Sequence, residues 1–206
     1  MKLLKKLTPK QIRIIRIAGL IIIVIGIIFL FYPFWPQVEY YINPPKANSY
    51  PYPTKLQGTN TNQVGKPTIA DKIPGENRVV IPKIGVDMKI VEGTNEKVAL
   101  NQGAWRYPTT SMPNKGGNTV ITGHRFKYRP PSKETFYLLD KLEKGDKFIV
   151  YWQGIEYDYE ITETKVVEKN AIEILNDTEE PIVTLFTCTP LFTTKQRLVV
   201  IGKLIE

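Results

Sequence analysis

Hydrophobic positions follow two different patterns along the chain. Residues 17–34 form an apolar run without a single charged side chain, whereas from residue 78 onward short β-branched runs are broken by Pro and Gly. As a helix, the first run would be about 27 Å long, close to the hydrocarbon thickness of a bilayer. Short runs separated by turn residues are typical of strands. The patterns therefore predict one transmembrane helix followed by a domain of mostly β structure.

Several strands and two short helices are predicted in the second part. Residues 78–93 read as two strands with a turn, and NTVITGHRF reads as a strand that ends at its Gly-His pair. Bulky and polar residues alternate on both sides of residues 153–154, as in a hairpin. PIVTLFT and QRLVVIGKLIE add two strands, and residues 96–102 and 135–142 are expected to be short helices. Many short strands with turns indicate a closed barrel or a sandwich.

Proline separates the two patterns. Seven prolines punctuate the segment between them: Pro36, Pro44, Pro45, Pro51, Pro53, Pro67 and Pro74. Proline lacks an amide donor and fixes φ, so regular ladders fail there. We therefore expect a basic N-terminus at 1–16, a transmembrane helix at 17–36, a Pro-rich linker or arm at 37–77 and a folded domain at 78–206. Whether the arm packs on the domain is left open.

The charge of the chain is concentrated before the apolar run. The net charge is +8, from 28 basic and 20 acidic residues, and six basic residues precede residue 17 without any acid. Basic residues on that side predict a cytoplasmic N-terminus and an extracytoplasmic domain in a single-pass membrane protein. The remainder carries only 22 basic against 20 acidic residues. Nucleic-acid binding, which needs a clustered basic face on the folded part, is therefore not expected.

A cleaved signal peptide is the alternative to the transmembrane helix. Its apolar region would be shorter, about 7–15 residues, and would end in a cleavage site with small residues. Here the run ends in FYPFWPQVEYY, which contains no such site. An uncleaved anchor is the favoured interpretation.

The chain has one cysteine and one histidine. Cys188 ends a predicted strand shortly before Pro190, Arg197 lies in the following strand, and His124 follows Gly123 at another strand end. A single cysteine cannot form an internal disulfide, and a leftover thiol outside the cell is a candidate reactive group. The loop between the last two strands leaves their register, and hence the proximity of Cys188 and Arg197, undetermined.

Together, these side chains could perform acyl transfer. A thiol attacks carbonyls as the thiolate, an imidazole can exchange the proton and later protonate an amine leaving group, and a guanidinium can stabilise an oxyanion. Each residue also has an ordinary interpretation: Cys188 as a small buried hydrophobic residue, His124 as a structural or exposed residue and Arg197 as a solvated one.

Three segments resemble the sortase family. TLFTC is similar to the signature Thr-Leu-x-Thr-Cys, with an arginine on the next strand, and TVITGHR is similar to the family's strand-end histidine segment. FYLLDKLEKGDKFIVY resembles the segment that follows that histidine. The similarity covers about residues 78–206, and the order His, Cys, Arg agrees.

The resemblance implies a closed eight-stranded β-barrel and a cysteine transpeptidase on the outer face of a bacterial membrane. His124 would be the general acid and base, Cys188 the nucleophile and Arg197 the oxyanion or substrate-positioning group, and Thr187 would help to shape the substrate site. Sortases cleave a C-terminal sorting signal such as Leu-Pro-x-Thr-Gly on secreted proteins. They transfer the acyl group to an amine on a cell-wall precursor or a pilin subunit.

The subclass stays open at this stage. TCTP is similar to pilin-polymerising and related sortases. Many pilin-type members carry an Asp-Pro-aromatic lid and a second, C-terminal membrane helix. This arm has YPYPTK without that acid, and the sequence ends at Glu206.

Two other functions are compatible with the residues. A cysteine endopeptidase would use the same thioester but pass the acyl group to water, and a non-catalytic β-domain on a tether would bind a surface partner. No cofactor is predicted. One histidine and one cysteine fall short of a zinc site, whereas a calcium site made of loop Asp and Glu is left open.

Overall fold

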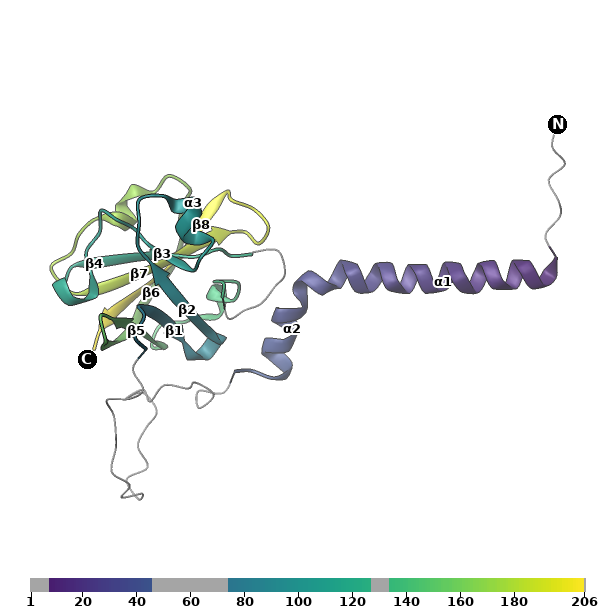
Figure 1. Cartoon of the computed structure of the whole chain (residues 1–206), viewed down its shortest axis with the longest axis horizontal. Coiled ribbons are helices and arrows are strands. Elements are labelled where there is room, and N and C mark those ends of the chain that lie inside the picture. Colours follow the sequence, from purple (N-terminus) through teal and green to yellow (C-terminus); the bar gives the residue numbers. More distant parts are fainter. Residues whose placement is uncertain (1–7, 46–73, 127–133, 206) are drawn as a thin grey trace, which may run out of the picture. The chain divides into compact units, whose positions relative to one another are not determined.

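The computed structural model describes residues 8–45, 74–126 and 134–205 (Figure 1). The chain divides into two compact units, Met1–Trp35 and Pro36–Glu206. The cytoplasmic segment predicted at 1–16 is therefore described only from residue 8. Most of the predicted linker, including YPYPTK, lies outside the described residues.

The first unit is an apolar helix. Helix α1 (Pro9–Phe31) begins after Thr8, whose side chain accepts a hydrogen bond from the Gln11 amide in a capping box. A 3-10 turn, η1 (Tyr32–Phe34), follows, and helix α2 (Trp35–Ile42) leads into the second unit. The helical stretch Pro9–Ile42 is long and apolar enough to cross a membrane, and none of its most apolar 18-residue window is buried. This confirms an N-terminal apolar helix of membrane-spanning length, which suggests anchoring.

The second unit is a closed eight-stranded barrel. The strand order is β1-β2-β3-β4-β7-β8-β6-β5, and β5 pairs with β1 to close it. The β2–β3 and β4–β7 pairs are parallel and the others antiparallel. The strands are β1 (Arg78–Ile81), β2 (Val86–Val91), β3 (Ala104–Arg106), β4 (Asn118–Thr122), β5 (Lys147–Trp152), β6 (Ile155–Glu168), β7 (Ile182–Thr189) and β8 (Gln196–Leu204). The predicted barrel is confirmed.

In the described residues, one short helix and four 3-10 turns lie between the strands. They are α3 (Glu96–Leu100), η4 (Pro82–Ile84), η5 (Pro113–Lys115), η6 (Leu139–Lys141) and η7 (Ile172–Leu175). The predicted helix at 96–102 is α3, which Asn95 caps by accepting a hydrogen bond from the Val98 amide. The predicted hairpin turn is present, with left-handed φ values at Gln153 and Gly154. Strand β3 was not predicted, because it has only three residues.

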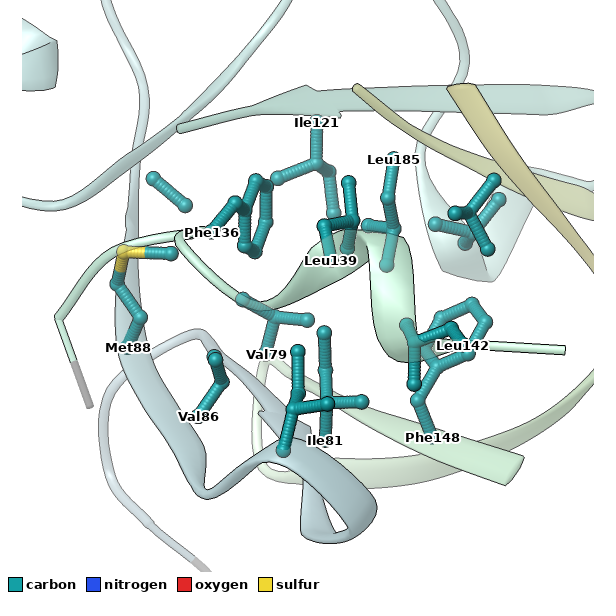
Figure 2. Packing of buried hydrophobic residues seen from close by; sticks show 14 of the residues in the cluster. Val79, Ile81, Val86, Met88, Ile121, Phe136, Leu139, Leu142, Phe148 and Leu185 are labelled. Atoms are coloured by element: carbon teal, nitrogen blue, oxygen red, sulfur yellow. The ribbon is translucent and has the colours of Figure 1, made fainter. Parts of the chain in front are cut away.

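The segment around η6 fills the inside of the barrel. Figure 2 shows Phe136 and Leu139 between Ile121 and Leu185 on one side and Val79 on the other. Every residue from 135 to 139 is buried, so no polar face remains for the helix predicted at 135–142. Only a 3-10 turn forms there, because the segment is shaped by the core that it fills rather than by a helical period.

The remaining core residues come from alternate positions of the strands. Val183 and Leu185 of β7, and Leu198 and Val200 of β8, belong to the same buried cluster as Ile121. Since successive side chains of a strand point to opposite faces, the residues between them face outward. This alternation determines on which side of the barrel wall the side chains of the candidate site lie.

Gly202 gives a test of this packing. A Cβ at Gly202 would lie 2.7 Å from Cζ of Phe148, whose ring stacks on Tyr159. We expect Gly202→Ala to lower the free energy of unfolding by about 1–3 kcal/mol, because the ring must move in a filled core. Denaturant titration of the full chain measures it. Gly75→Ala, where the added Cβ meets nothing within 4 Å, is the control. Equal stability of the two variants would contradict this packing.

Candidate active site

Strands β7 and β8 place Cys188 opposite Arg197. The two residues are register partners in the antiparallel pair, so their Cα atoms lie about 4.5–5.5 Å apart and their side chains emerge on the same face. Both residues are half-buried. The structure thus supplies the register that the sequence left undetermined.

Both side chains are on the outer face of the barrel wall. Cys188 is out of phase with the inward-pointing Leu185, and Arg197 is out of phase with Leu198. The thiol is therefore not part of the inner core, as the ordinary interpretation of a lone cysteine would require.

Strand β4 brings His124 to the other side of Cys188. In the parallel β4–β7 pair, Thr122 is the partner of Phe186, and the Gly123 amide donates to the Phe186 carbonyl at 3.4 Å. Two residues further along the two segments, His124 comes level with Cys188. The cysteine therefore lies between the histidine segment and the arginine strand.

Gly123 determines which way His124 points. A Cβ at Gly123 would lie 3.0 Å from the Phe136 ring and 3.2 Å from the Met88 methyl group, so this position faces the filled core. In extended backbone the next residue points to the opposite side. His124 therefore leaves the wall on the outer face, the face that carries Cys188 and Arg197.

Thr187 lies beneath the outer face, beside the histidine segment. Its side chain is 1% exposed, and its hydroxyl donates to the Gly123 carbonyl at 2.7 Å. The hydroxyl therefore joins the histidine segment to the cysteine strand. The expected role of Thr187 in shaping the substrate site stays a prediction.

The Arg197 guanidinium is positioned by backbone contacts. Nη1 donates to the carbonyl oxygens of Thr194 at 3.2 Å and Gln196 at 3.1 Å. No carboxylate pairs with this side chain in the described part of the chain. A guanidinium has five N–H donors, so others are left for an acyl oxygen or a substrate carbonyl.

Several neighbours of His124 were missed by the sequence reasoning. The Phe136 amide donates to the His124 carbonyl at 2.9 Å, and Arg125 forms a 2.7 Å ion pair with Asp140. Phe126 contacts the ring of Phe192, in the β7–β8 loop, with the centroids 4.8 Å apart. No periodic pattern links these residues, since the contacts join a strand end to the core segment and to a loop.

The described residues contain no group of three or more His, Cys, Asp or Glu that could hold a metal ion. The three candidate active-site side chains are a thiol, an imidazole and a guanidinium. These groups can form a thioester from an amide and pass its acyl group to a second nucleophile.

Comparisons with known proteins point to one family. The family model described as "Sortase domain" matches residues 79–205. The chain is 26% identical to Sortase A of Listeria monocytogenes over 92% of this chain and 90% of the relative. It is 29% identical to Sortase SrtE1 of Streptomyces coelicolor, over 93% of this chain but only 57% of that longer protein. The Streptococcus pneumoniae Sortase C structure superposes with a TM-score of 0.57 at 36% identity, covering 64% of this chain and 68% of that one.

Two threonines of β7 allow the role of the Thr187 hydroxyl to be tested. Thr187→Val leaves the Gly123 carbonyl without its partner, and Thr184→Val removes a similar bond of 2.8 Å to Asn118 at the other end of the strand. We expect each to cost about 1–2 kcal/mol of stability. Of the two variants, only Thr187→Val should slow alkylation of Cys188 by iodoacetamide. The Thr187 hydroxyl contacts the histidine segment, whereas the Thr184 hydroxyl does not. Equal alkylation rates would contradict the assigned role.

Proposed function

Because the chain belongs to the sortase family of cysteine transpeptidases, we propose that it cleaves an LPxTG-like sorting signal through a thioester on Cys188 and transfers the acyl group to an amine. The single observation that carries the proposal is the register match of Cys188 with Arg197 beside the His124 segment. This juxtaposition supplies a nucleophile, a proton carrier and an oxyanion donor on one face.

The proposed first half-reaction forms the thioester. The Cys188 thiolate attacks the carbonyl carbon of the scissile Thr-Gly amide, and the negative charge that develops on oxygen is stabilised by N–H donors of Arg197. His124, as the imidazolium, gives its proton to the departing glycine amine. The C–N bond breaks, the C–S bond remains, and His124 is left neutral.

The second half-reaction reverses the proton transfer. The incoming amine loses a proton to neutral His124 as it attacks the thioester carbonyl, and the thiolate departs. The new amide then carries the acyl group, and both active-site groups return to their starting charges. Water in place of the amine would give hydrolysis, which is the reaction of the endopeptidase alternative.

The proposed location is the cell membrane, crossed once by the N-terminal helix, with residues 1–16 in the cytoplasm and the barrel outside. The apolar stretch Pro9–Ile42 and the six basic residues before residue 17 support this orientation. Secreted proteins bearing a C-terminal sorting signal would then be delivered on the same side of the membrane as the barrel.

The proposed acceptor is an amine of a cell-wall precursor or of a pilin subunit. The description of the Streptococcus pneumoniae structure names pilin substrate specificity, which supports a pilin acceptor. The segment YPYPTK lacks the acid of a pilin-type lid, which favours the cell-wall acceptor. The acyl-transfer chemistry is the same for both.

Mass spectrometry of the full chain in detergent, incubated with an LPxTG peptide, tests the acyl enzyme. We expect an adduct on Cys188 with the mass of the peptide cut after threonine, and none in Cys188→Ala. Adding triglycine should divert this acyl group into an amide product. If added amine never appears in product while hydrolysis proceeds, the chain is an endopeptidase and the transferase proposal fails.

Arg197 variants test the oxyanion role. Arg197→Ala removes the donors opposite Cys188 and should lower kcat by about 10²–10³-fold, the usual effect of losing an oxyanion donor. Arg197→Lys keeps the charge without the planar set of donors and should fall between this variant and the wild type. A kcat close to wild type for Arg197→Ala, measured by product formation at saturating peptide, would exclude the role.

A further inference from the structure

A second arginine lies buried next to the proposed catalytic histidine. Arg125 is 7% exposed, and its Nη2 group donates to Oδ1 of Asp140 at 2.7 Å. Its Nε and Nη1 groups are also buried but have no hydrogen-bond partner. A buried guanidinium with donors left unpaired is costly, and such a group in a native structure calls for an explanation.

The backbone around Arg125 connects the site to the barrel core. The His124 carbonyl, one residue earlier, accepts the Phe136 amide, and the Phe126 ring, one residue later, lies 6.4 Å from that of Tyr137. The Arg125–Asp140 pair adds a side-chain link to the same core segment. Three consecutive residues of the histidine segment are therefore fixed to the segment that fills the barrel.

Burial lowers the pKa of Arg125, and the neighbouring Asp140 carboxylate opposes that effect. The pair is a charge-assisted contact with a buried arginine, and such a contact is less screened than one between surface charges.

We propose that Arg125 and Asp140 are a positioning pair of the active site, which fixes the His124 segment beside Cys188. The inference rests on the proposed function, because it assigns work to His124 and Cys188. Arg125 touches no reacting atom, so it acts through its neighbours.

Asp140 makes further contacts toward the surface, but these are not part of the proposed pair. Lys141 Nζ lies 3.3 Å from Oδ2 of Asp140 and 3.1 Å from the hydroxyl of Tyr41, in α2. Tyr41 is 70% exposed, and contacts between exposed groups contribute little. Lys141 is the other cation near Asp140, and its charge is unchanged in the variants below.

Variants of the full chain separate positioning from simple structural support. Asp140→Asn and Arg125→Gln each break the ion pair, and Arg125→Lys keeps the charge without the planar set of donors. All three should lower kcat for the LPxTG peptide at least tenfold with a smaller change in KM.

The matched control is a similar ion pair elsewhere in the barrel. Arg106 and Glu92 also form a 2.7 Å pair with a buried arginine, between β3 and the end of β2. Glu92→Gln should leave kcat within about twofold of wild type, even if it costs as much stability as Asp140→Asn. Equal effects of Glu92→Gln and Asp140→Asn on kcat would overturn the proposal.

Failure of the pair is distinguishable from failure of the proposed function. If the wild-type chain forms the thioester but Arg125→Gln and Asp140→Asn share its kcat, only the positioning pair is excluded. If no thioester forms on Cys188, the proposed function itself fails. Should Arg125→Gln not fold, Arg125→Lys and Asp140→Asn decide: a kcat equal to wild type in both excludes the positioning pair.

Discussion

The pairing of β7 with β4 on one side and with β8 on the other is the interaction on which the candidate site depends. Parallel pairing sets His124 level with Cys188, and antiparallel pairing sets Arg197 opposite it. Backbone hydrogen bonds fix these neighbours without help from the side chains themselves. The three groups can therefore remain partly exposed and available for chemistry while their relative positions are fixed by the wall of the barrel.

The inner layer gives this wall its rigidity. Thr187 and Gly123 face inward and are joined by a hydrogen bond, while Phe136 occupies the space that a Cβ on Gly123 would need. Gly123 faces the core, which leaves no room for a larger residue there. The next residue, His124, therefore points outward. The same packing of Phe136 against Gly123 fills the interior and directs the His124 imidazole to the outer face.

The sequence predicted the strands with clear alternation or β-branched runs, and family resemblance named His124, Cys188 and Arg197. It did not predict β3, which is too short to show a period, or the irregular form of the segment ending at Leu142, in which residues 135–139 are all buried. The register of Cys188 and Arg197 depends on the geometry of the loop between β7 and β8. The composition of that loop does not determine its geometry. For the same reason the partnership of Arg125 with Asp140 became visible only once the chain was folded.

The segment that fills the barrel interior also contacts the strand end that carries His124. Direct contacts join the two, such as the hydrogen bond from the Phe136 amide to the His124 carbonyl, so loosening of the interior is transmitted directly to the reactive groups. Heating should therefore abolish the reactive geometry in the same cooperative event that melts the barrel. We therefore expect no long-lived form in which the barrel is folded but the Cys188 thiol is separated from His124 and Arg197.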